Sequence, residues 1–286
     1  MKLRLPKGHA IDLSYTKVMG TIALTEDDTR SIEDLVMLAK SFVQSGAEFL
    51  EVGAKVGCNG LDETRVSSVL GAVLNAVKVP VAVNSNSKEI IEQAINAGVA
   101  MIITNDGLAT EGVMDLVKDS DVLICLHYEP QSKIRDDEDI VAKVSEYFFE
   151  RIDACLEAGI DRKRLIIDPS VVNASVSARL KLIGRLESFK SFALPMLVAI
   201  PKQLPKEDHF MNENRVLSLT TAIFCSAAKS VQIIRTSEVA EVAIAIGFWQ
   251  IMSSKTKPYG ISKAIVRRLR TLRDTLRDFK NHHKDK

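Results

Sequence analysis

The chain has 286 residues, of which 46% are hydrophobic and 26% charged, with a net charge of +1 at pH 7. This composition is typical of a folded protein with a large core, and the balanced charge gives no overall attraction to nucleic acid. No run of 18 apolar residues and no apolar leader occurs, so neither a membrane span nor a secretion signal is expected. The four cysteines form no CxxC pair, which argues against a zinc or disulfide framework and predicts a cytoplasmic protein.

Short apolar runs alternate with helical patterns along most of the chain. Two alternating runs around Pro6–Gly8 first predict an N-terminal hairpin. The predicted strands then cover residues 17–23, 48–53, 79–84, 99–104, 121–126, 164–168, 195–200 and 231–235. The predicted helices cover residues 31–45, 63–77, 87–97, 110–118, 138–158, 176–190, 213–229 and 237–251. The strands are rich in Val, Ile and Leu throughout, which indicates burial on both faces of a parallel sheet.

Eight strands, each followed by a helix, predict an α/β fold, the (β/α)₈ TIM barrel, with residues 1–252 as one domain. A doubly wound open sheet has the same alternation and is the alternative. In a barrel, functional residues lie where the strands end and the loops begin. Those ends fall at residues 23–28, 53–60, 84–87, 104–107, 127–130, 168–173, 201–203 and 235–237.

Two of these ends carry amides. The third strand ends in the sequence VAVNSNS, so that Asn84 begins a cluster of short, neutral, hydrogen-bonding side chains. Asn105 follows the fourth strand in the sequence IITNDG. An amide both donates and accepts hydrogen bonds, which suits the edge of a heterocycle. Ordinary turn chemistry is the alternative for Asn105–Asp106, because Asn-Asp-Gly is a strong turn signal.

Charged side chains follow other strands. Asp168 ends the sixth strand, where a carboxylate is costly unless it is paired; it is either an acceptor for a guanidine-like edge, such as that of a pterin, or a structural cap. Arg235 ends the eighth strand and would stack on a flat ring, hold an anion or form a salt bridge to a carboxylate at the barrel mouth. Lys202 and Gln203 follow the seventh strand, and His127 is a base or a structural hydrogen-bonding group.

The C-terminal segment differs from the body of the chain. From Ile251 to Lys286 there are 11 Lys and Arg residues and 3 Asp and Glu residues, a net charge of +8. Residues 253–286 are therefore predicted to form a separate, basic amphipathic helical tail. It would pack on its own barrel, contact a partner helix or a second copy, or bind an acidic surface or nucleic acid. Its apolar stripe consists of Ile261, Ile265, Leu269, Leu272, Leu276 and Phe279.

Eight stretches resemble, in order, the motifs of the dihydropteroate synthase family. They are VMGTIALTEDD, GAEFLEVGAKVGCNG, VAVNSNS, AGVAMIITNDG, CLHYEP, LIIDPS, LPMLVAIPKQ and VQIIRTSEV, covering roughly residues 10–240. The resemblance implies a (β/α)₈ barrel that holds a pterin deep inside. It also implies a transferase that joins p-aminobenzoate to a pterin methyl diphosphate and expels pyrophosphate, with Mg²⁺ as a cofactor if that reaction is retained. We further expect a homodimer.

Carried over by position, the resemblance makes Asn84, Asn105, Asp168, Gln203 and Arg235 the pterin-binding residues. Lys202 and Arg235 would form an anion site. Asn84 stands where the family has an aspartate, and Gln203 stands where it has a lysine. Because Asn84 lacks the aspartate charge, the sequence predicts that Asn84→Asp tightens pterin binding.

The rim of the barrel departs further from the family pattern. Ala23, Gly57–Cys58 and Ser237 stand where the family has Asn, Thr-Arg and His. Expulsion of pyrophosphate needs stabilisation of the charge that develops on phosphate oxygens. The sequence thus predicts a diverged, pterin-binding member with weak or absent synthase activity. The alternatives are an active synthase with rewired anion contacts, a methyltransferase that uses a methylated folate, and a non-catalytic scaffold or regulatory subunit.

Overall fold

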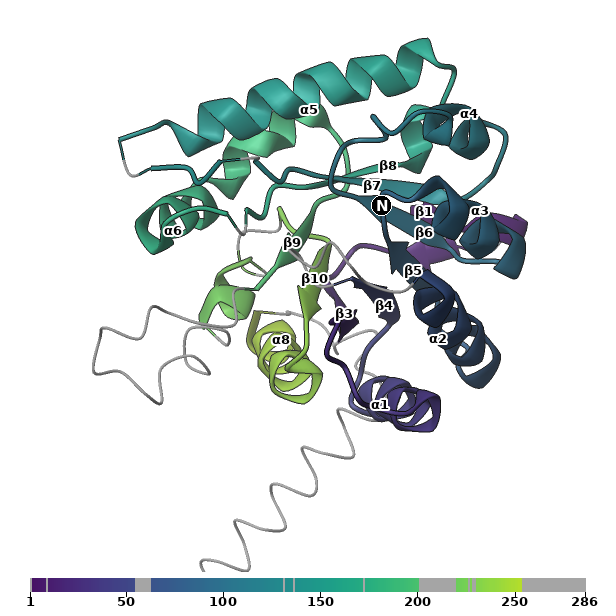
Figure 1. The fold of residues 1–286 in the computed structure, drawn as a ribbon. Helices are drawn as coiled ribbons and strands as arrows, with labels where there is room; N and C mark the ends of the chain where they lie inside the picture. The colour runs from purple at the N-terminus through teal and green to yellow at the C-terminus, as the bar shows by residue number, and fades with distance from the viewer. Residues whose placement is uncertain are drawn as a thin grey trace, which may run out of the picture.

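The computed structural model describes residues 2–8, 10–54, 63–130, 132–135, 137–171, 173–200, 220–225, 227 and 230–253. Within these ranges, eight parallel strands form a nearly closed barrel with helices around it (Figure 1). This confirms the predicted (β/α)₈ barrel. Among the helices that the structure describes, none has both the length and the apolar character needed to span a bilayer.

The strands follow one another around the barrel in the order β8-β7-β6-β5-β4-β3-β10-β9. Ile167 and Met196 form a parallel bridge that joins the two ends of this row, and the Ile167 amide donates to the Pro195 carbonyl at 3.0 Å. These contacts exclude the open sheet. The strands are β3 Lys17–Leu24, β4 Phe49–Ala54, β5 Val81–Asn84, β6 Met101–Thr104, β7 Leu123–His127, β8 Leu165–Asp168, β9 Leu197–Ala199 and β10 Ile233–Thr236.

The helices lie outside the barrel, close to their predicted bounds. They are α1 Ile32–Gln44, α2 Glu63–Ala76, α3 Lys88–Ala97, α4 Val113–Lys118, α5 Ile140–Glu157, α6 Val176–Gly184 and α8 Val239–Ser253, with 3₁₀ helices η1 Pro6–Gly8, η2 Arg162–Arg164 and η3 Leu186–Phe192. Ser31 caps α1 by accepting a hydrogen bond from the Asp34 backbone N–H. Most of the predicted helix 213–229 lies outside the described residues, but residues 220–225 are helical.

One predicted helix is wrong in its extent. The pattern over residues 176–190 predicts a single helix, whereas α6 ends at Gly184 and η3 follows. Glycine is a poor helix former, and the next residue, Arg185, leaves the helical conformation with φ −120° and ψ 21°. The break still buries both Leu186 and Phe189 against the core.

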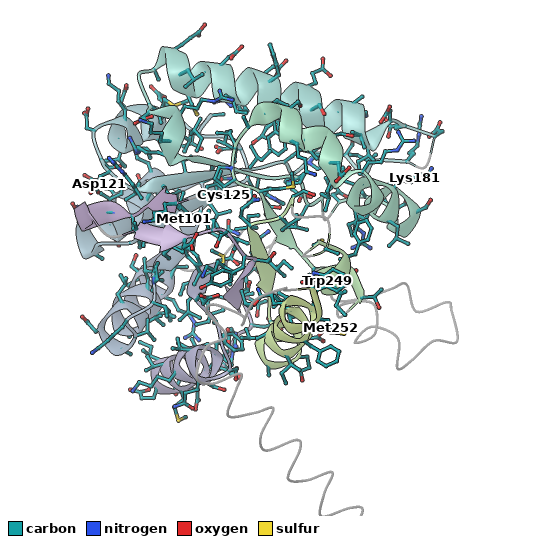
Figure 2. All side chains as sticks on the ribbon, turned by 180° about the vertical axis from the view of Figure 1, so that it is seen from behind. Met101, Asp121, Cys125, Lys181, Trp249 and Met252 are labelled. Atoms are coloured by element: carbon teal, nitrogen blue, oxygen red, sulfur yellow. The ribbon has the colours of Figure 1, made fainter. Side chains whose placement is uncertain are left out.

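The N-terminal hairpin closes the amino end of the barrel. Its strands, β1 Lys2–Arg4 and β2 Ala10–Asp12, pair in antiparallel register. Leu3 and Leu13 are buried with the inward-facing apolar side chains of the barrel, which include Met101 and Cys125. Met101 and Cys125 are labelled in Figure 2. The hairpin therefore confirms the prediction, and the barrel interior is a packed core at this end.

The interior changes from apolar to polar along the strands. Alternate side chains of a strand point into a barrel, and on β4 the apolar Phe49 is followed by Glu51. On β8 Ile166 is followed by Asp168, which is fully buried. The carboxyl end of the barrel thus holds a buried polar layer above the apolar core, and this layer is the candidate site.

Candidate functional site

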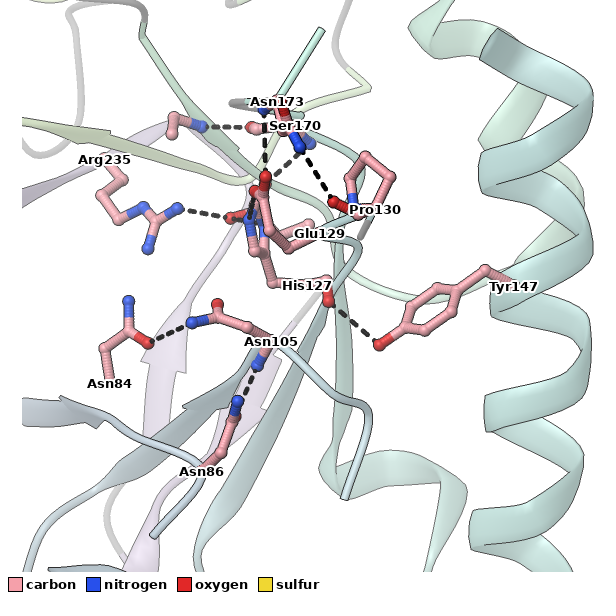
Figure 3. A network of polar contacts seen from close by, with 12 residues as sticks. Asn84, Asn86, Asn105, His127, Glu129, Pro130, Tyr147, Ser170, Asn173 and Arg235 are labelled. Carbon is pink, nitrogen blue, oxygen red and sulfur yellow. Dashed lines mark hydrogen bonds and ion pairs between the residues drawn. The ribbon is translucent and has the colours of Figure 1, made fainter. Parts of the chain in front are cut away.

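Arg235 connects two buried carboxylates of the polar layer, and Figure 3 shows its side chain among the polar contacts of this layer. Its Nη1 donates to Glu51 Oε1 at 2.9 Å, and its Nη2 donates to Asp168 Oδ2 at 3.0 Å. Burial opposes the charge of this guanidinium, but the two carboxylates outweigh it and raise the pKa of Arg235. Of the roles that the sequence left open for Arg235, the salt bridge is the one seen in the structure.

Glu51 is a site residue that sequence reasoning missed. Its side chain is 2% exposed and bridges three strands. It accepts hydrogen bonds from Thr21 Oγ1 at 2.8 Å and from Asn84 Nδ2 at 2.7 Å, in addition to the bond from Arg235. The available signal was a single carboxylate at an inward position of an apolar strand, because a buried charge needs partners and is seldom placed there without a role.

The contact with Glu51 fixes the orientation of Asn84. An ionised carboxylate only accepts hydrogen bonds, so Asn84 must turn its NH₂ group toward Glu51. Its oxygen, Oδ1, then lies on the other side of the amide, 3.4 Å from Asn105 Nδ2. That distance is long for an N–H···O bond. Asn84 therefore presents a weakly used acceptor next to Asn105.

Asn105 and Asp106 divide the two roles that the sequence left open for the Asn-Asp-Gly stretch. Asp106 builds the turn: it accepts hydrogen bonds from the amides of Leu108 and Thr110, both at 3.0 Å. Burial raises the pKa of Asp106, but hydrogen bonds outweigh burial and lower it. Asn105 Oδ1, in contrast, is buried and has no hydrogen-bond partner among the described residues. An unpaired buried acceptor of this kind suits a donor from a ligand.

The remaining residues of the VAVNSNS stretch build loops. Ser85 Oγ accepts from the Ser87 amide at 3.0 Å, and Ser87 caps α3 by accepting from the Ile90 amide at 3.3 Å. Asn86 Oδ1 accepts a hydrogen bond from the backbone N–H of Asn105 at 2.9 Å, and this bond joins two loops of the barrel mouth. The stretch therefore ends a strand, builds a turn and starts a helix, while Asn84 joins the polar layer.

Asp168 is held as a carboxylate between Arg235 and His127. Its Oδ2 contacts Arg235 and lies 3.2 Å from His127 Nδ1, and its Oδ1 accepts from the Ser170 amide at 3.0 Å. Burial raises the pKa of Asp168, but His127 and Arg235 outweigh burial and lower it. Asp168 is thus an ionised acceptor at the end of β8.

His127 links Asp168 to the loops of the rim. Its Nε2 lies 3.4 Å from Glu129 Oε2, and Glu129 Oε1 accepts from the Asn173 amide at 3.0 Å (Figure 3). Burial disfavours the charged imidazole, but Asp168 and Glu129 outweigh burial and Arg235, and raise the pKa of His127. The structure supports the structural alternative for His127, because both ring nitrogens face carboxylates.

Comparison with known families places most of the chain in one of them. The family model described as "Pterin binding enzyme" matches residues 23–237. The chain belongs to the pterin-binding enzyme family. Among its curated relatives, the dihydropteroate synthase of Escherichia coli K12 is 27% identical over 268 residues, which cover 86% of this chain and 94% of the relative. The dihydropteroate synthase of Neisseria meningitidis serogroup B is also 27% identical, over 271 residues, covering 85% and 94%.

Solved structures of relatives share the fold of this chain. The dihydropteroate synthase of Coxiella burnetii in complex with pteroic acid superposes with a TM-score of 0.79 at 22% identity, covering 90% of this chain and 100% of that chain. The Xanthomonas albilineans synthase with 4-aminobenzoic acid gives a TM-score of 0.79 at 24% identity, with the same coverage. These matches confirm the resemblance to dihydropteroate synthases and the barrel fold.

At the rim of the barrel, Arg30 covers the end of β3. Its Nη2 donates to the Ala23 carbonyl at 2.8 Å, and its Nε donates to Asp28 Oδ1 at 2.8 Å.

Among the described side chains, no group of three or more His, Cys, Asp or Glu residues is arranged to hold a metal ion. A surface hollow of about 530 Å³ between α5 and η3 shares no residue with the polar layer and is not part of the site.

Several predicted positions lie outside the described residues. They include Lys202 and Gln203 after the seventh strand, Gly57–Cys58 in the second loop, and residues 254–286 of the predicted tail. Their placement stays a prediction. Glu51 joins Asn84 to Arg235. Arg235 in turn contacts Asp168, and Asn105 lies beside Asn84.

Proposed function

We propose that the carboxyl end of the barrel binds a pterin-like ring through Asn84, Asn105 and Asp168. The observation that carries this proposal is the buried, unpaired Asn105 Oδ1 beside the weakly used Asn84 Oδ1. A pterin presents ring N–H and exocyclic NH₂ donors along one edge. Adjacent acceptors opposite such an edge satisfy donors that would otherwise be buried without partners.

The charges of the layer favour the same class of ligand. Glu51 and Asp168 are balanced by Arg235 and by His127 when the imidazole is protonated. A ring without a full charge therefore enters without leaving an unpaired buried ion, which would be costly. Family membership supports this ligand class, as does the Coxiella burnetii relative, which was solved in complex with pteroic acid.

We further propose that the standard synthase reaction is weak or absent. Both terminal nitrogens of Arg235 are already paired with carboxylates. Ala23 and Ser237 offer no amide or imidazole where the resembling family has them. Each missing donor to a developing anion costs about 10²- to 10³-fold in rate. Lys202 remains a candidate cation for the anion site, and Mg²⁺ would be needed only if the reaction is retained.

One observation favours an active synthase with rewired anion contacts as a second candidate. Arg30 places its guanidinium on the Ala23 carbonyl, at the position where the resembling family has an asparagine. Asp28 neutralises much of this charge through its ion pair with Arg30. Pyrophosphate release from a pterin methyl diphosphate and p-aminobenzoate separates the two candidates, because only the second predicts release that falls sharply in Arg30→Ala.

The ring-binding proposal is tested by calorimetry with a pterin. We expect the wild-type chain to bind the pterin and Asn105→Ala to lose at least about tenfold in affinity. The substitution leaves a buried donor of the ligand without its hydrogen-bond partner. Ser85→Ala is the matched control, since its hydroxyl faces its own loop, and it should bind like wild type. Equal affinities for wild type and Asn105→Ala would refute the assignment of Asn105, and an absence of wild-type binding would refute the proposed ligand class.

A further inference from the structure

Glu51 joins two parts of the polar layer through a single oxygen atom. Its Oε1 accepts from Arg235 Nη1 at 2.9 Å and from Asn84 Nδ2 at 2.7 Å. Its Oε2 accepts from Thr21 Oγ1 at 2.8 Å. Both carboxylate oxygens are therefore engaged by donors from three other strands. Glu51 acts on a ligand through these neighbours rather than through a free oxygen.

The consequence for Asn84 is a choice between two orientations of its amide. In the observed orientation the NH₂ group faces Glu51 and the oxygen faces Asn105. The reverse orientation would place two acceptors in contact at the Glu51 oxygen. A hydrogen bond to a charged group favours one orientation by about ten- to a hundredfold. Asn84 thereby keeps its oxygen turned away from Glu51, on the side where Asn105 lies.

The backbone of β4 also fixes the position of Asn84. Gly53 is paired with Asn84 in the register of β4 and β5. A Cβ atom at Gly53 would lie 2.5 Å from the Asn84 carbonyl oxygen and 2.6 Å from the Asn84 Cβ. The absence of a side chain at Gly53 lets the two strands approach there. β4 thus places Asn84 through Gly53 and orients its amide through Glu51.

We propose that Glu51 is a positioning residue that fixes Asn84 as a hydrogen-bond acceptor for a ring N–H. This inference rests on the ring-binding function proposed above. It assigns the site to heterocycles that present an N–H donor opposite Asn84. Analogues that present a ring nitrogen acceptor there should be rejected, because two acceptors would then face each other without a proton.

The contact also changes what is expected of Asn84→Asp. The sequence alone predicts tighter pterin binding, since the substitution restores a charge. The structure places the new carboxylate at hydrogen-bonding distance from Glu51, where two like charges repel each other and one is forced to take up a proton. We therefore expect Asn84→Asp to bind a pterin at least about tenfold more weakly near pH 8, a change equal to 1.4 kcal/mol, and to recover as the pH falls.

A double-mutant cycle tests the proposal. Glu51→Gln, Asn84→Asp and the double variant are compared with wild type by calorimetry with a pterin and by urea unfolding without ligand. Glu51→Gln removes the repelling charge, so the double variant should regain most of the affinity that Asn84→Asp loses. Asn105→Asp is the matched control: it adds a carboxylate beside the oxygen of Asn84 rather than its NH₂, and Glu51→Gln should rescue it much less.

The outcomes separate this inference from the proposed function. If wild type binds the pterin but the effects of the two substitutions simply add, Glu51 only pairs with Arg235 and does not position Asn84. The inference is then overturned. If Asn84→Asp binds more tightly than wild type at every pH, the assigned orientation is wrong. If wild type binds no pterin, the proposed function fails. The unfolding cycle then still tests the contact, because it predicts that Glu51→Gln restores stability lost in Asn84→Asp.

Discussion

His127 should make the stability of this protein depend on pH in a predictable direction. The imidazole is fully buried, 3.2 Å from Asp168 and 3.4 Å from Glu129. These carboxylates outweigh burial and the nearby Arg235, and raise the pKa of His127 above its ordinary value. A raised pKa in the folded state means that the native protein holds this proton more tightly than the unfolded chain does.

The size of the effect follows from this linkage. In the unfolded chain His127 titrates near pH 6.5. Its stabilising contribution is complete below that pH and is lost as the pH rises through the raised folded pKa. Between the two values, the free energy of unfolding of wild type should fall relative to His127→Asn by up to about 1.4 kcal/mol per pH unit. Above the folded pKa the difference should become constant.

Urea unfolding between pH 5.5 and pH 9 measures this difference for wild type, His127→Asn and Glu129→Gln. The Glu129 variant removes one of the two carboxylates, so its pH dependence should lie between those of the other two proteins. An NMR titration of the imidazole in wild type gives the folded pKa directly. Parallel stability curves for wild type and His127→Asn across this range would refute the assignment of a charged His127.

Two further predictions concern packing and the tail. Gly53→Ala should destabilise the fold by about 1–3 kcal/mol through overpacking against Asn84 and should weaken pterin binding. The control Gly71→Ala should do neither, because its new Cβ would meet nothing within 4 Å. Equal effects of the two substitutions would contradict the close approach of β4 and β5. Truncation after Tyr259 should lower either dimerisation or the free energy of unfolding. Size-exclusion chromatography with light scattering measures the first and urea unfolding the second. No change in either would argue against a packing role for the tail.

Most of the fold was predictable because it depends on local patterns. Apolar runs and helical periodicity repeat eight times, and a parallel sheet with eight helices closes readily into a barrel. The break between α6 and η3 was not predicted, because the apolar spacing continues through Gly184 and only the backbone departs from the helix at Arg185. Local propensity and tertiary packing compete at such a point, and the sequence pattern alone does not decide between them.

The candidate site was predictable where a strand meets its loop. Asn84, Asn105, Asp168 and Arg235 were found because each stands at the end of a buried strand. Glu51 was missed because it lies within β4, three residues before the strand ends. Its pairing with Arg235 joins residues 184 positions apart, which depends on closure of the barrel rather than on any local signal.

The orientation of Asn84 is a second feature that the sequence could not supply. The residue type alone leaves donor and acceptor open, and only the contact with Glu51 decides between them. This contact reverses the expected effect of Asn84→Asp.

The central claim is that the polar layer at the carboxyl end of the barrel binds a pterin-like ring. Calorimetric titration of the wild-type chain with a pterin, beside Asn105→Ala and Ser85→Ala, tests it most directly. The claim predicts saturable binding to wild type and Ser85→Ala, with at least about tenfold weaker binding to Asn105→Ala. An absence of binding to the folded wild-type protein would contradict it.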